Sequence, residues 1–111
     1  MIKDILQIAA LPGRPGRYLN PPAETYGIYF DEVTADGADP IALPAGAKLP
    51  RIYTHNIRLE LYEPTPDDAK EAKVEAALCA KVGYWYKSER IWLASVQRYQ
   101  VYYEFNYTTK Y

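Results

Sequence analysis

The segment from Tyr53 to Glu63, YTHNIRLELYE, constrains the fold more than any other part of the chain. Its side chains alternate in character, and the positions on one side are His55, Ile57, Leu59 and Leu61. The positions between them carry Asn, Arg and Glu. A period of two with one polar face is typical of a half-buried strand in an antiparallel sheet. We therefore expect a sheet with one buried face.

Three other segments have the composition of strands. Residues 26–33, YGIYFDEV, and 90–94, RIWLA, are short and rich in aromatic and β-branched side chains. Residues 98–108, RYQVYYEFNYT, alternate again and place one apolar set on a common face: Tyr99, Val101, Tyr103, Phe105 and Tyr107. Because only three residues separate positions 94 and 98, we expect the last two strands to form a hairpin.

Tyrosine is the unusual feature of the composition. The chain has 12 tyrosines in 111 residues, and seven of them lie between positions 84 and 111. Two interpretations stay open. Aromatic side chains favour strands, and tyrosine also suits a surface that contacts other subunits, because its ring is apolar and its tip is polar.

Two segments predict helices. Residues 2–11, IKDILQIAAL, place apolar side chains on one helical face and end at Pro12. The second helix follows the central strand, with Thr65 expected as the N-cap, Pro66 at the first helical position and Gly83 at the end.

The second helix has two apolar tracks on different sides. The small track comprises Ala69, Ala72, Ala76, Cys79 and Ala80, and the bulkier track comprises Val74, Leu78 and Val82. One track can lie on the sheet, which leaves the other to contact a loop or a neighbouring molecule.

The expected order of elements is α-β-β-α-β-β. Grouped strands and separated helices indicate an α+β fold, a mostly antiparallel four-stranded sheet with two helices packed on one face. The length predicts a single domain over residues 1–111. Residues 34–52 are expected to form a long loop that is flexible or carries a small hairpin around 41–48, and loops of this length are usually functional.

Candidates for catalysis or metal binding are few. His55 lies on the apolar face of its strand, where we expect it to be packed and hydrogen-bonded. Cys79 lies in the second helix, where we expect a small buried side chain. The residues around them in the sequence supply neither a catalytic constellation nor a ligand set, so we predict no enzymatic activity, no cofactor and no metal.

The charge and hydropathy patterns exclude other classes of partner. A net charge of −1 provides no basic field for nucleic acid. No apolar run reaches the roughly 18 residues of a membrane span. A single cysteine and the lack of a signal peptide indicate a cytosolic protein. The PGRPG segment follows a helix and so is no phosphate loop, but Arg14 and Arg17 are suited to contact an anion or an acidic partner.

Four segments occur in a fixed order between Thr25 and Phe105: TYGIYFDE, ADGADP, NIRLELYEPTPDDAKEAKVEAAL and SERIWLASVQRYQVYYEF. In this order the chain resembles the tail-terminator or tail-completion proteins of bacteriophages and prophages with long, non-contractile tails. These are often called minor structural tail proteins. The chain departs from the pattern at PIALPAGAKLP, which is longer and richer in proline.

The resemblance implies a tail-terminator-like sheet flanked by helices, and copies that assemble into a ring, commonly a hexamer. Such a ring sits on the end of the tail tube, stops the growth of the tube and presents a surface to the head connector. The implied location is the bacterial host cytoplasm during assembly and then the tail or neck of the virion, with DNA contact limited to passage through the ring. The alternatives are a head-completion or neck connector protein and a non-phage protein-binding module.

Ring assembly requires two different contact patches on each copy. We expect them in the long loop, the second helix and the last strand. The candidate interface residues are Asp36, Asp39, Lys48, Arg51, Val74, Leu78, Tyr102 and Glu104.

Overall fold

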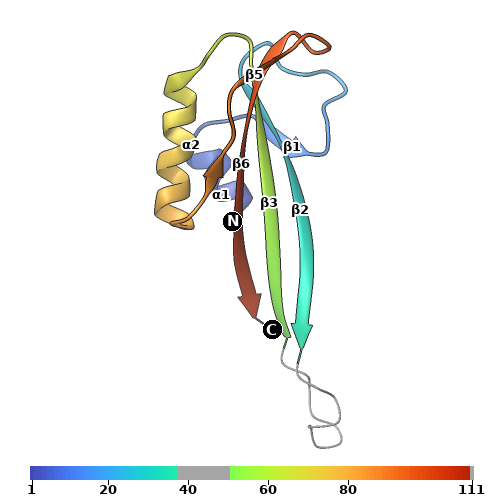
Figure 1. Ribbon diagram of the computed structural model, residues 1–111, viewed down its shortest axis with the longest axis vertical. Coiled ribbons are helices and arrows are strands. Elements are labelled where there is room, and N and C mark those ends of the chain that lie inside the picture. The colour runs from blue at the N-terminus through green and yellow to red at the C-terminus, as the bar shows by residue number, and fades with distance from the viewer. Residues whose placement is uncertain (38–50, 111) are drawn as a thin grey trace, which may run out of the picture.

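The computed structural model describes residues 1–37 and 51–110 and has the α+β fold that the sequence predicts (Figure 1). Two helices are present in these residues, α1 (Ile2–Ile8) and α2 (Asp68–Lys81). The long strands are β2 (Tyr26–Gly37), β3 (Arg51–Glu63) and β6 (Arg98–Lys110). The short strands are β1 (Gly13–Pro15), β4 (Tyr86–Lys87) and β5 (Ile91–Leu93).

The strands form one mixed six-stranded sheet in the order β1-β2-β3-β6-β4, with β5 also paired to β6. The three long strands are antiparallel, and their register places Leu59 opposite both Tyr29 and Tyr103. β5 and β6 form the expected hairpin, with Trp92 opposite Tyr99. The prediction of a mostly antiparallel four-stranded sheet is wrong in the number of strands, because β1 and β4 extend the sheet, and β1 runs parallel to β2.

β1 forms because the core holds this proline-rich segment against β2. Leu11 is buried just before the strand, and the N–H of Gly27 donates to the carbonyl of Pro12 at 2.7 Å. The close approach depends on the glycine, since an added Cβ at Gly27 would lie 3.0 Å from Leu11 and 3.2 Å from Leu59. A three-residue strand has no readable period, so only such tertiary contacts determine it.

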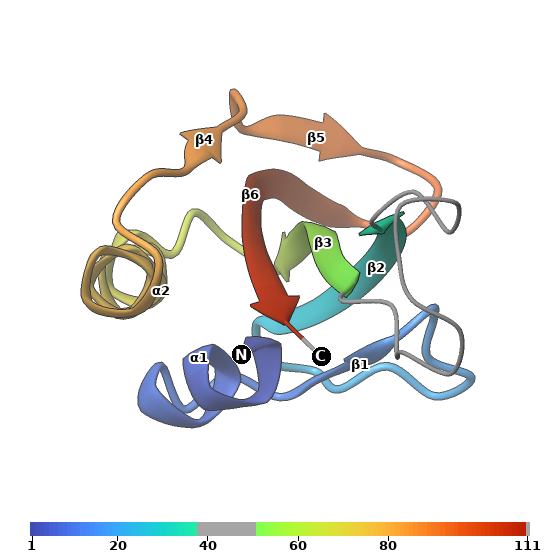
Figure 2. The same ribbon diagram turned by 90° about the horizontal axis from the view of Figure 1, so that it is seen from below.

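Both helices contribute to one core on the same face of the sheet (Figure 2). The buried strand residues of this core are Ile57, Leu59, Leu61, Val101, Tyr103 and Phe105. The alternation in the sequence predicts that these side chains face inward on β3 and β6, and this prediction is confirmed. The helices supply the remainder, including Ile5, Val74 and Leu78.

α2 begins two residues later than predicted. Its N-cap is Asp67, whose side chain accepts a hydrogen bond from the N–H of Lys70 at 3.1 Å. Thr25 also donates its hydroxyl to Asp67 at 2.6 Å. The prediction of Thr65 as the cap is wrong because this contact with a segment far away in the sequence fixes Asp67 instead.

The long strands continue beyond both helices as a three-stranded arm, residues 32–37, 51–56 and 106–110 (Figure 1). Within it Asn56 lies opposite both Glu32 and Asn106. The prediction of a loop over residues 34–52 is therefore wrong at both ends, where the chain is still in β2 and β3. Residues 38–50, including the predicted small hairpin, lie outside the described residues.

Candidate functional site

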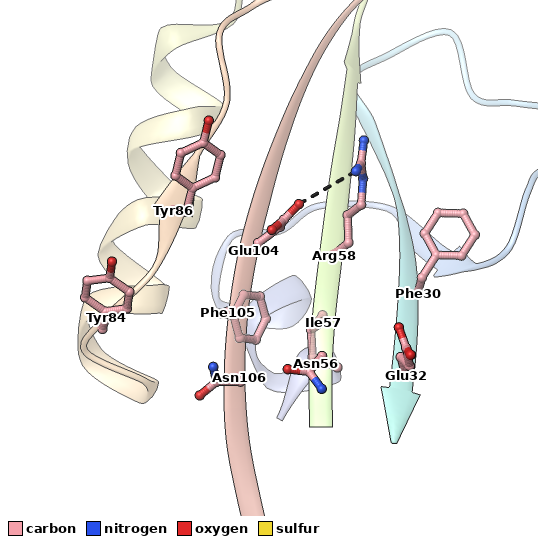
Figure 3. A pocket seen from close by; sticks show the side chains of 10 residues that line it. All are labelled: Phe30, Glu32, Asn56, Ile57, Arg58, Tyr84, Tyr86, Glu104, Phe105 and Asn106. Carbon is pink, nitrogen blue, oxygen red and sulfur yellow. Dashed lines mark ion pairs between the residues drawn. The ribbon is translucent and has the colours of Figure 1, made fainter. Parts of the chain in front are cut away.

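An open hollow of about 460 Å³ lies on the sheet face opposite the helices (Figure 3). Outward-facing side chains of β2, β3 and β6 line it, together with Ile57 and Phe105, which also belong to the core. Phe30 borders the hollow on the β2 side, and Tyr84 and Tyr86 border it on the β4 side. The opposed side chains of Asn56 and Asn106 lie toward the arm. The hollow thus combines aromatic edges with polar groups.

Among the described lining residues, Arg58 is the cation, and its neighbours hold it in place. Its Nε donates to Glu60 at 2.9 Å, and its Nη1 lies 3.7 Å from Glu104, the ion pair drawn in Figure 3. The guanidinium carbon also lies 3.8 Å from the centre of the Tyr102 ring, a cation–π contact. The described lining residues include two carboxylates, Glu32 and Glu104, and one cation, Arg58, so this surface is net negative.

Glu60 is itself fixed by Tyr62. The Tyr62 hydroxyl donates to Glu60 at 2.8 Å and accepts from the Gln100 amide at 3.0 Å, while its ring stacks on Tyr26. Burial and the neighbouring Glu60 raise the pKa of Tyr62 to about 12. The phenol therefore stays a neutral donor at physiological pH and keeps Glu60 oriented toward Arg58.

A charged cluster fastens the β4 side of the hollow to α2. Lys87, in β4, lies 2.8 Å from Glu71 and 3.1 Å from Glu75. Arg90, just after β4, pairs with Glu71 and lies 3.3 Å from Glu63. Glu63 and Glu71 are both buried, so their carboxylates anchor the strand and do not reach solvent.

The two buried carboxylates have opposite proton affinities. Burial and a hydrogen bond shared with Glu71 raise the pKa of Glu63 to about 8. Burial also opposes ionisation of Glu71, but hydrogen bonds from Glu63, Lys87 and Arg90 outweigh it and lower the pKa to about 2. At neutral pH the pair therefore shares one proton, and Glu63 is the carboxyl whose pKa is raised.

His55 lies in the arm and is packed and hydrogen-bonded, as predicted. Its Nδ1 lies 3.1 Å from Asp31, its Nε2 lies 3.2 Å from the Thr109 hydroxyl, and its ring stacks on Tyr107. Across the described part of the chain, no three His, Cys, Asp or Glu side chains are grouped so that they could hold a metal ion.

The structure disperses the predicted interface residues. Tyr102 and Glu104 share the outward face of β6, where both contact Arg58. Asp36 and Arg51 belong to the strands at the far end of the arm. Asp39 and Lys48 lie outside the described residues.

Val74 and Leu78 are wrong as interface residues. Both are fully buried, because α2 turns its bulkier track toward the sheet. The track left at the surface is the small one: Ala69, Ala72, Ala76, Cys79 and Ala80. The prediction of a buried Cys79 is therefore also wrong, and this exposed thiol accepts the indole N–H of Trp85 at 3.4 Å.

The sequence interpretation missed the residues that shape the hollow, Phe30, Arg58, Tyr84 and Tyr86. Two signals were present. The polar positions of the central strand carry an arginine two residues from a glutamate, and tyrosines are concentrated after position 84. Neither signal shows that these groups converge, because the pairing of β4 with β6 brings them together.

No protein-family model matches the chain, and neither does any curated protein. In the residues that the structure describes, no helix is both long and apolar enough to cross a membrane. The function is therefore inferred from the surfaces of the chain and from the order of its sequence segments.

Proposed function

We propose that this protein is a structural component of a tailed bacteriophage or prophage that completes the tail tube and joins it to the head. It acts by assembling into a ring and makes or breaks no covalent bond. The order of segments in the sequence supports the phage assignment. The observation that carries the mode of action is the three-stranded arm and its two long edges, which no described strand covers.

The two long edges of the arm belong to different strands. Beyond Tyr29, no described strand lies against the outer edge of β2, and beyond Glu104 none lies against the outer edge of β6. Strand edges with main-chain N–H and C=O groups available are templates for pairing with another chain.

Unlike edges favour a head-to-tail contact. When the β2 edge of one copy meets the β6 edge of the next, the contact is heterologous and closes into a ring if the rotation between copies allows it. The arm also exposes apolar side chains, Val33 and Ile52, which a neighbour would cover. The arm therefore offers both hydrogen-bonding groups and apolar area to a second copy.

Tube capping tests the proposal. Purified protein is mixed with tail-tube subunits from the same genome, and tube length is scored by electron microscopy while light scattering reports the oligomeric state. We expect the protein to form rings on tube ends and to limit tube length. Binding to the head connector without binding to tubes would favour the neck connector, and binding to neither would favour a module unrelated to tails.

Two matched variants separate the arm from the rest of the surface. Val33→Lys places a charge on the β2 edge strand, where lysine is known to block edge pairing. Val96→Lys makes the same change in the turn between β5 and β6, and the two valines are similarly exposed, at 48% and 43%. Val33→Lys is expected to lose capping while Val96→Lys keeps it, and equal capping by both would refute assembly through the arm.

A further inference from the structure

We propose that the hollow receives the proline-rich basic loop, residues 13–22, of a second copy of this chain. The inference rests on the proposed self-assembly and names one contact within it. It assigns the two partners by charge, shape and position in the sheet.

The basic loop presents cations and an apolar tip to solvent. Arg14 and Arg17 are exposed, and no acidic residue occurs between Asp4 and Glu24. Among the described residues no ion pair involves Arg17, and the guanidinium carbon of Arg14 lies 5.7 Å from the centre of the Tyr18 ring. Leu19 is 81% exposed, so its apolar side chain is available to a partner.

The first part of the loop, residues 13–18, is held in place before the loop binds. Gly16 adopts a φ of +77°, and its N–H donates to the carbonyl of Tyr29 at 3.2 Å. The ring of Tyr18 packs edge-on against Tyr26 with centroids 5.2 Å apart. β1 pairing fixes the start of the loop. A preformed loop loses little conformational entropy when it docks, which favours its use as a contact.

The hollow complements this loop in chemistry. Arg58 is already paired with Glu60 and Glu104, so the additional carboxylate of Glu32 leaves the surface negative. Exposed rings at its borders, Phe30 and Tyr84, suit a leucine side chain or the face of a guanidinium. Opposite charge at such a surface favours encounter and fixes orientation.

The positions of loop and hollow allow a chain of identical contacts. The loop adjoins β1, and β4 lies at the other end of the strand order (Figure 2). Tyr84 and Tyr86, on the tyrosine side of the hollow, lie at or just before β4. One copy can therefore donate its loop on one side and receive a loop on the other. This is the head-to-tail geometry that a ring requires.

Disulfide trapping between two differently sized copies tests the contact. The native thiol is removed from both with Cys79→Ser, then one copy receives Leu19→Cys and the other Tyr84→Cys. Both positions are more than four-fifths exposed, at 81% and 84%, so the variants are expected to fold. The control partner carries Ala72→Cys, on the exposed face of α2 across the sheet from the hollow.

Docking is expected to make the Leu19→Cys and Tyr84→Cys pair cross-link about tenfold faster than the control pair, because a bound contact raises the effective concentration of the thiols. Equal rates for the two pairs would overturn the proposal, whether the hollow stays empty or takes a segment of another protein.

Charge reversal supplies the second readout. Arg17→Glu on the loop copy, or Glu104→Arg on the hollow copy, is expected to slow cross-linking about two- to fivefold, and combining both is expected to restore it. Cross-linking that stays fast with either single change would overturn the electrostatic pairing proposed here. If the protein caps tubes but this pair does not cross-link, the contact is refuted and the tail function stands. If the pair cross-links but the protein does not cap tubes, the tail function alone is refuted.

Discussion

Glu63→Gln tests whether the buried carboxylates share one proton. Oε1 of Glu63 accepts from the N–H of Asp67 and faces Arg90, whereas Oε2 has no hydrogen-bond partner when both glutamates are ionised. Glutamine keeps an oxygen at the first position and places an NH₂ group at the second, where it can donate to Glu71. The variant therefore mimics the protonated acid and cannot ionise.

The magnitude follows from the pKa of Glu63, which folding raises from 4.5 to about 8. The folded state therefore binds more protons than the unfolded state between these values, so the stability that Glu63 provides below pH 4.5 is lost as the pH rises. At about 1.36 kcal/mol per pH unit, the free energy of unfolding of the wild-type protein falls by about 3 kcal/mol between pH 4.5 and 7 because of this titration. The variant cannot ionise at this position and keeps that stability. Any constant penalty from the second amide hydrogen cancels in this difference.

Urea unfolding at pH 4.5 and 7 measures the difference directly. The free energy of unfolding of Glu63→Gln relative to wild type is expected to rise by about 3 kcal/mol between the two pH values. Glu89→Gln, at an exposed position, is the control and is expected to show no such rise. If Glu63→Gln tracks the wild type at both pH values, Glu63 is ionised in the fold and the shared proton is refuted.

Other predictions concern the core, the cap and the loop. Leu59→Ala removes a fully buried side chain and should lower the free energy of unfolding in urea by about 2–5 kcal/mol; a loss below 1 kcal/mol would contradict its central place in the core. Asp67→Ala should lower thermal stability by about 0.5–2 kcal/mol while Thr65→Ala stays within about 0.5 kcal/mol, and the reverse order would restore Thr65 as the cap. Asp39→Ala or Lys48→Ala should keep the fold by circular dichroism yet weaken tube capping, and unfolding of either variant would show that these residues support the core.

The sequence predicts the strands in which the apolar pattern repeats several times. The alternation from His55 to Leu61 identifies the buried face of β3, and the same pattern in the last strand identifies Val101, Tyr103 and Phe105. A period of two needs several repeats to be recognised, and only the long strands provide them. The orientation of α2 was not predictable in this way, because both of its tracks are apolar and only contact with the sheet selects the bulkier one.

Short elements and converging side chains could not be predicted. β1 and β4 have three and two residues, and they form because the core and the ion pairs of Lys87 hold them beside longer strands. The hollow exists only after β4 pairs with β6, since this step brings Tyr86 opposite Glu104. Pairing across a fold depends on tertiary contacts, which no local pattern encodes.

The distribution of burial explains why assembly can be altered without unfolding the chain. The buried side chains gather where the helices cover the sheet, and that end includes the anchoring carboxylates of Glu63 and Glu71. Val33 and Ile52 on the arm and Leu19 on the basic loop are among the exposed apolar side chains outside this core. Substitutions at these surface positions remove little buried area, so they should change the association of copies far more than the stability of each copy. Measuring both quantities for each variant therefore separates a surface that serves partners from one that serves the fold.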